Sequence, residues 1–209
     1  MIRKILAAIF IMAGLAAMSV PFFYYFYGNQ KSAELIKQFE QSAEQAYRKD
    51  GKKEEKRENE AEDECAKIPG HFKDVSLLSS GDVIGLIEIE ALDLKYPIVE
   101  GTDSKQLAHG IGHIPNTAAI GEKGNCVLAG HRGSRYGAYF KYLNRLSQGN
   151  IIKITDKEGN VYQYEVISWE VVEPYDNSVK AQGEEKKLTL ITCENSGTMR
   201  LVYHCACKG

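Results

Sequence analysis

The chain has 209 residues, 44% of them hydrophobic and 26% charged, which is typical of one globular domain with appended segments. Its 26 basic and 28 acidic residues leave a formal net charge of −2, so no excess of positive charge favours a nucleic acid partner. Cysteine occurs five times, so at least one thiol has no partner within the chain, and nothing indicates a dense disulfide framework.

The N-terminus contains an uncharged segment, residues 5–27, directly after Arg3 and Lys4. It is long enough to cross the ~30 Å hydrocarbon core of a bilayer as a helix. The preceding cations favour a cytoplasmic N-terminus with the rest of the chain outside, and aromatic residues gather at the outer end of the segment. A cleaved signal peptide is the alternative, but the segment is long for one and offers no small-residue cleavage site. We therefore expect a cytoplasmic stub and single-pass cell-membrane anchor over residues 1–27.

The second predicted part, residues 28–74, is a charged helical stalk or linker. Leu35, Phe39 and Ala43 recur at spacings of four, which favours an amphipathic helix. Residues 50–64 are almost wholly charged and cannot bury a core, so we expect a solvated helix or flexible stalk. Its consequence is reach, because it holds the following domain away from the bilayer. A docking role for a partner is the alternative reading of this charged run.

The third predicted part, residues 75–209, is rich in short β-strands separated by turns. The strand candidates are residues 83–90, 94–99, 126–129, 151–155, 161–172, 187–193 and 199–205. Short helical patterns interrupt them at 102–108 and 139–146, and a hairpin turn is expected at 156–160. Pro97 suggests that its strand lies at an edge or begins a bend. Seven or eight short strands with little helix favour a mainly β fold, a closed barrel or sandwich, over a βαβ sheet.

Three residue types that suit acyl transfer come from separate parts of this domain. Residues 188–193 read Leu-Thr-Leu-Ile-Thr-Cys, which places the Cys193 thiol at the end of a strand. Arg200 lies on the next predicted strand, and His131 follows a short apolar strand upstream. A thiol, an imidazole and a guanidinium are a nucleophile, a proton carrier and an anion stabiliser. Taken singly, each has an ordinary structural reading: a buried cysteine, a hydrogen-bonded turn histidine and a solvent-facing arginine.

At these residues the chain resembles the sortases, the membrane-anchored cysteine transpeptidases of Gram-positive surfaces. Their catalytic strand reads T-L-x-T-C, with an Arg on the following strand and a His after a short strand upstream. The resemblance covers roughly residues 83–203 and implies a closed eight-stranded barrel with short helices. It implies that Cys193 is the nucleophile, His131 the general acid and base, and Arg200 the stabiliser of the oxyanion or substrate carbonyl.

The resemblance also implies the reaction and its partners. Cys193 attacks the Thr carbonyl of an L-P-x-T-G-like C-terminal sorting signal on a secreted protein. An amine from a cell-wall precursor or a pilin then resolves the thioacyl enzyme. Residues 129–133, Ala-Gly-His-Arg-Gly, resemble the pilin-polymerising class or class D. No Asp-Pro-aromatic lid motif is seen, since Val75 and not Pro follows Asp74, so we expect an anchoring enzyme with an open site.

No cofactor is expected. Residues 204–207, His-Cys-Ala-Cys, offer three metal ligands, but strand alternation points Cys205 and Cys207 to one face and His204 to the other. Calcium is known in some relatives; here there is no unambiguous acidic cluster, although Glu88 and Glu90 are candidate contributors to such a site.

The pairing of the other cysteines stays open, and His113 is given a structural role. Cys205 or Cys207 can pair with Cys65 or Cys126, and the sequence does not choose between them. His113, in the stretch Gly-Ile-Gly-His, is interpreted as structural.

Two other classes of function remain as alternatives. A membrane-anchored cysteine protease that only hydrolyses also fits the order of His before Cys. Such enzymes tend to carry a glycine-rich segment around the nucleophile, which residues 191–194 lack. A non-catalytic, membrane-tethered surface module in which Cys193 fills the core is the second alternative.

Overall fold

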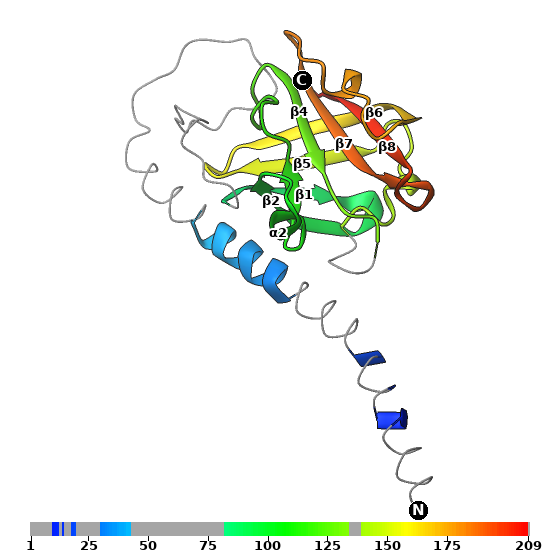
Figure 1. The fold of residues 1–209 in the computed structure, drawn as a ribbon. Helices are drawn as coiled ribbons and strands as arrows, with labels where there is room; N and C mark the ends of the chain where they lie inside the picture. The colour runs from blue at the N-terminus through cyan, green and yellow to red at the C-terminus, as the bar shows by residue number, and fades with distance from the viewer. Residues whose placement is uncertain are drawn as a thin grey trace, which may run out of the picture.

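The computed structural model describes residues 10–12, 14, 18–19, 30–42, 82–133 and 139–208. A helix over residues 30–42 precedes a β-barrel that begins at Val83 (Figure 1). Within these described ranges, no helix is both long and apolar enough to cross a membrane. Most of the predicted anchor and the charged run at 50–64 lie outside the described residues.

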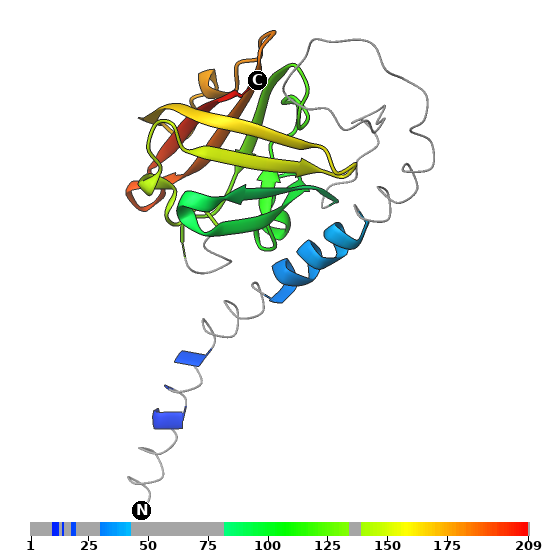
Figure 2. The same ribbon diagram turned by 180° about the vertical axis from the view of Figure 1, so that it is seen from behind.

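Eight strands form the barrel, as the sequence and its family resemblance predict (Figures 1 and 2). Their bounds are β1 Val83–Ile89, β2 Leu94–Glu100, β3 Ile111–His113, β4 Gly124–Ala129, β5 Ile151–Asp156, β6 Val161–Val172, β7 Lys186–Glu194 and β8 Met199–Cys207. Around the closed barrel they follow the order β1-β2-β3-β4-β7-β8-β6-β5. The short helical elements are α2 Ser104–Leu107 and the 3-10 turns η2 Glu90–Leu92, η3 Leu143–Arg145, η4 Ser178–Lys180 and η5 Asn195–Gly197.

Two details differ from the sequence-based expectation. Strand β3 has three residues, which is too short to show the alternation by which strands are recognised. Strand β2 has neighbours on both sides in the barrel, so it is not an edge strand. Pro97 pairs with Leu86 of β1, and the pairing of β2 with β3 starts one residue later, at Ile98. Proline is therefore tolerated because its position has a strand partner on one side only.

The parallel pairing of β4 with β7 is central to the positioning of the site. Six consecutive pairs join the strands, from Gly124 opposite Lys186 to Ala129 opposite Ile191. Both strands run in the same direction, so their carboxyl ends reach the same rim of the barrel. Whatever follows Ala129 and Ile191 is therefore brought together there.

Alternating side chains divide the central strands between two apolar clusters. On β7, Leu188 and Leu190 are fully buried in the large cluster inside the barrel. Ile191, which points the other way, packs with Val127, Val202 and Val179 in a second cluster. Full burial of one such aliphatic side chain is worth roughly 1.5–3 kcal/mol, so a one-residue slip of β7 would cost several of these contributions.

The end of β8 follows the predicted alternation. Cys205 is buried and Cys207 packs at the margin of the inner cluster, whereas His204 faces outward and pairs with Glu170 at 2.8 Å. Cys126, Cys193 and Cys205 carry free thiols, while Cys207 is disulfide-bonded.

Candidate active site

His131 and Cys193 are brought together by the register of β4 and β7. Beyond the last strand pair, the Gly130 N–H donates to the Ile191 carbonyl at 3.1 Å. The buried Thr192 hydroxyl donates to the Gly130 carbonyl at 2.8 Å. The parallel register thus continues past Ala129 and sets His131 beside Cys193. The second threonine of the 188–193 motif therefore has a structural task, fixing the backbone that carries the histidine.

Gly130 is required by a close approach to an aromatic ring. A Cβ atom at this position would lie 2.6 Å from the Phe140 ring, closer than any carbon contact allows. Phe140 is fully buried, so its ring has no room to move aside. Its backbone N–H donates to the His131 carbonyl at 3.0 Å. The main chain of His131 is thus held from β7 on one side and from Phe140 on the other.

The side chains of His131 and Cys193 line one pocket of about 620 Å³. Its lining residues are His131, Arg132, Gly133, Cys193, Glu194, Asn195, Ser196 and Gly197. Burial lowers the pKa of His131 below its ordinary value, because desolvation disfavours the imidazolium. The imidazole is therefore mainly neutral at pH 7, the form that accepts a proton from a thiol.

Arg200 is the direct cross-strand partner of Cys193 on β8. Residues opposite each other on antiparallel strands have Cβ atoms about 5 Å apart and project on the same face. The guanidinium donates from Nη1 to the carbonyls of Gly197 at 2.9 Å and Met199 at 3.0 Å, and Arg200 is not among the residues that line the pocket. A contact with a substrate carbonyl requires a change in this side chain, not in the strand.

The turn between β7 and β8 has an unusual backbone. Asn195, Ser196 and Gly197 have φ values of 46°, 56° and 95°, so three successive residues are left-handed. Asparagine and glycine tolerate this region, whereas serine adopts it at a cost. The same residues form one wall of the pocket and supply the carbonyl that holds Arg200.

The ion pair between Arg132 and Glu194, next to His131 and Cys193, was not predicted from the sequence. Arg132 pairs with Glu194 and also donates from Nη1 to the Cys193 carbonyl at 3.3 Å. Each partner directly follows one member of the His131–Cys193 pair. The opposite charges of Arg132 and Glu194 are visible in the sequence, but they indicate an ion pair only when the β4–β7 register is known.

His113, interpreted as structural from the sequence, lies away from this pocket. Its side chain is 2% exposed. Its Nδ1 contacts the Glu100 carboxylate at 2.9 Å, and its Nε2 contacts the Ala118 carbonyl at 3.0 Å and the Thr117 hydroxyl at 3.1 Å. Burial alone would lower the pKa of His113, but its contacts with Cys126 and Glu100 outweigh burial and raise it to about 10. Its contacts are those of a buried structural group.

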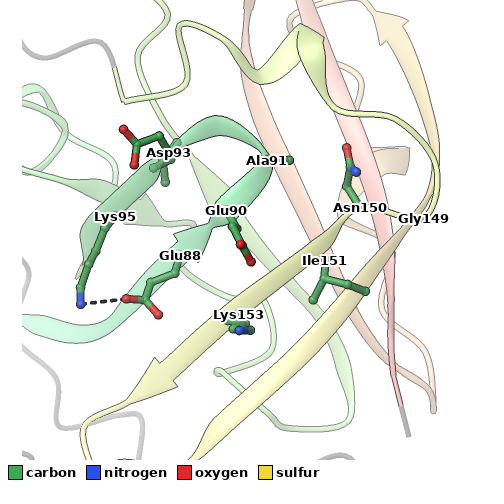
Figure 3. A pocket seen from close by; sticks show the side chains of 10 residues that line it. Glu88, Glu90, Ala91, Asp93, Lys95, Gly149, Asn150, Ile151 and Lys153 are labelled. Atoms are coloured by element: carbon green, nitrogen blue, oxygen red, sulfur yellow. Dashed lines mark ion pairs between the residues drawn. The ribbon is translucent and has the colours of Figure 1, made fainter.

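The calcium candidates Glu88 and Glu90 line a different pocket, shown in Figure 3. Glu88 is paired with Lys95 at 2.8 Å, and Lys153 brings a second ammonium group to the same hollow. Cations so placed compete with a metal for the carboxylates. Within the described part of the chain, no group of three His, Cys, Asp or Glu side chains is arranged to hold a metal ion.

Comparisons with known proteins agree on one family. Residues 87–208 match the sortase domain. Sortase D of Bacillus subtilis is 28% identical over 192 residues, which is 91% of this chain and 89% of that protein. Sortase A of Bacillus anthracis is 34% identical over 116 residues, which is 56% of this chain and 54% of that protein.

Among solved structures, a Clostridium perfringens sortase D5 transpeptidase superimposes with a TM-score of 0.64 at 29% identity. This superposition covers 87% of the 209-residue chain and 98% of that structure.

Proposed function

The chain belongs to the sortase family of cysteine transpeptidases, and we propose that Cys193, His131 and Arg200 are its catalytic residues. The observation that carries this proposal is the register. The β4–β7 pairing sets His131 beside Cys193, and the β7–β8 pairing sets Arg200 opposite Cys193. One strand end thereby meets a proton carrier on one side and a fixed cation on the other.

The first half of the reaction forms a thioester. The Cys193 sulfur attacks the scissile carbonyl carbon of a sorting signal of the L-P-x-T-G type, and the thiol proton passes to neutral His131. Arg200 leaves its turn carbonyls and donates to the oxyanion that develops. The tetrahedral adduct then collapses, the C–N bond breaks, and His131 returns the proton to the departing amine.

The second half transfers the acyl group. An amine of a cell-wall precursor or a pilin attacks the thioester carbon and gives one proton to His131. The C–S bond breaks and the Cys193 thiol takes that proton back, so atoms and protons balance over the cycle. Amine must outcompete water, which requires a site that holds the amine close to the thioester.

We propose that the enzyme acts at the outer face of the cell membrane on exported proteins. The support is the uncharged segment at 5–27 with cations before it, which favours a single span with the barrel outside. Membrane fractionation, followed by protease treatment of intact protoplasts, tests this arrangement. Barrel fragments should be digested from outside while an N-terminal tag stays protected; a soluble or internal barrel would contradict it.

The test of the reaction uses the 209-residue chain in detergent with a sorting-signal peptide, with and without an amine acceptor. Mass spectrometry should find a thioester adduct on Cys193 and, with amine, a transfer product. Hydrolysis that ignores the amine would favour a cysteine protease instead. Cys126 and Cys205 are internal controls, since both are 1% exposed and burial raises the pKa of the Cys205 thiol to about 12. A Cys193 that resists a thiol probe as they do would favour a surface module.

A further inference from the structure

The helix over residues 30–42, outside the matched family domain, presents one face to the barrel. Among its residues, Ser32 is 2% exposed and Phe39 is 7% exposed, and Leu35 and Ile36 are partly buried. These four positions follow the 32, 35, 36, 39 spacing of a single helical stripe. The other face carries charged and exposed residues. Figures 1 and 2 both show this helix alongside the barrel, near β1, β2 and α2.

Ser32 forms the most specific contact of this face. Its hydroxyl donates to the His109 carbonyl at 2.8 Å and contacts the Tyr139 hydroxyl at 3.1 Å. The Tyr139 hydroxyl in turn donates to the Ala108 carbonyl at 2.8 Å. The Ser32 and Tyr139 hydroxyls have one hydrogen each. These two hydrogens are therefore shared among three contacts, two of which are with the successive carbonyls of Ala108 and His109. A buried hydroxyl network of this kind is sensitive to the loss of one member.

A surface ion pair fixes the other end of the helix. The Lys95 ammonium lies 2.8 Å from Glu40 of the helix and 2.8 Å from Glu88 of β1 (Figure 3 shows the Glu88 pair). All three side chains are between 38% and 52% exposed, so the pair contributes to orientation more than to binding strength. Glu40 lies eight residues after Ser32, so the two contacts together set the direction of the helix along the barrel.

Tyr139 links the helix to the active site. It is 1% exposed, and its ring packs in a T-shaped arrangement with the Tyr96 ring, with centroids 4.7 Å apart. Phe140 follows directly; its N–H holds the His131 carbonyl, and its ring fills the space that Gly130 leaves open. A chain of contacts thus runs from Ser32 through Tyr139 and Phe140 to the backbone of His131.

We propose that the helix over residues 30–42 is a positioning element of the active site, acting through Ser32 on the Tyr139–Phe140 pair that holds His131. The stalk therefore begins with a clamp on the catalytic domain. This inference rests on the proposed role of His131. Ser32 and Phe39 touch no substrate; they act by keeping the imidazole in the register that faces Cys193. A misplacement by a fraction of an ångström is enough to slow a proton transfer.

The experiment compares Ser32→Ala with the matched control Ser42→Ala in the 209-residue chain in detergent. Ser42 lies on the same helix, but its hydroxyl bonds back to the Gln38 carbonyl on the exposed face. Ser32→Ala should lower kcat for acyl transfer by about tenfold with KM changed less than about twofold. Ser32→Thr, which keeps the hydroxyl, should restore most of the rate. Hydrogen exchange at the Phe140 amide should quicken in Ser32→Ala and not in Ser42→Ala.

The outcomes separate this inference from the function on which it rests. If the unmodified chain transfers no acyl group, the proposed function fails and the positioning role with it. If the unmodified chain is active and Ser32→Ala matches Ser42→Ala in kcat and in Phe140 exchange, only the positioning role is overturned. A reduced kcat that Ser32→Thr does not restore also overturns it. Phe39→Leu is a second probe should Ser32→Ala unfold, and its kcat is expected to fall while its KM stays unchanged.

Discussion

His113 ends β3 and His131 follows the last residue of β4 by two positions; the two strands are neighbours in the barrel, yet the surroundings of the two histidines are opposite. His113 is buried with partners on both ring nitrogens, and its contacts raise its pKa to about 10. His131 lines an open pocket, and burial lowers its pKa. Cys126 and, after it, Glu100, the cross-strand partner of His113, make this difference. A neighbouring anion favours the charged imidazole, whereas burial favours the neutral one.

The largest expected effect separates the two residues by activity. His131→Ala should lower kcat/KM for acyl transfer by about 10³-fold, the usual contribution of a general acid and base, and leave the thermal midpoint nearly unchanged. His113→Gln should keep kcat within about threefold in the folded protein. Steady-state kinetics with calorimetry on both variants checks this. Equal losses of activity would mean that the site does not distinguish the two histidines.

For the free energy of unfolding we expect the reverse order, with a larger loss for His113→Gln than for His131→Ala. His113→Gln leaves the partly buried Glu100 carboxylate without its cationic partner, so we expect a loss of about 3 kcal/mol in the free energy of unfolding. The double variant with Glu100→Gln should recover part of this loss, because the unpaired charge is gone. Urea titrations of the single and double variants measure the coupling. Additive losses would show that the two groups do not interact.

The pH dependence of the two histidines should also differ in sign. His113 has a raised pKa, so its stabilisation is complete below the unfolded value of about 6.5 and is lost as pH rises through 10. His131 has a lowered pKa, so its contribution is present above about 6.5 and lost as pH falls further. The rate should likewise fall on the acid side, where His131 becomes charged and no longer accepts the thiol proton. Unfolding titrations and kcat/KM between pH 5 and 10, on chains lacking either histidine, check both limbs.

The smallest expected effect concerns the Arg132–Glu194 ion pair, whose two residues line the same pocket as His131. Arg132 and Glu194 are 25% and 23% exposed, so breaking the pair by Glu194→Gln should cost about 1 kcal/mol or less. We expect a fall in kcat of a few fold, since the pair ties the two strand ends together. Lys187→Gln, which breaks a surface pair with Glu185, is the matched control and should leave kcat unaltered. A Glu194→Gln variant with the kcat of this control would reduce the pair to a surface contact.

Most of the fold could be predicted from local pattern. Strands β5 to β8 were found within about two residues because each is a run rich in apolar and β-branched residues that is bounded by turn residues. Strand β3 was missed because three residues carry no period. The amphipathic face of the helix over 30–42 was visible in Leu35 and Phe39, but its role was not. A stalk with a solvated face and a helix docked on a barrel have the same local pattern.

The amino-acid sequence by itself determined the family and named Cys193, His131 and Arg200 as candidate site residues, because all three belong to short local motifs. Only the tertiary structure decided that Arg132 joins Glu194, that Glu100 holds His113, and that Ser32 reaches Tyr139. Each of these pairs joins segments whose proximity depends on strand register or on docking. Such contacts are set by packing over long sequence separations, and no local pattern encodes them.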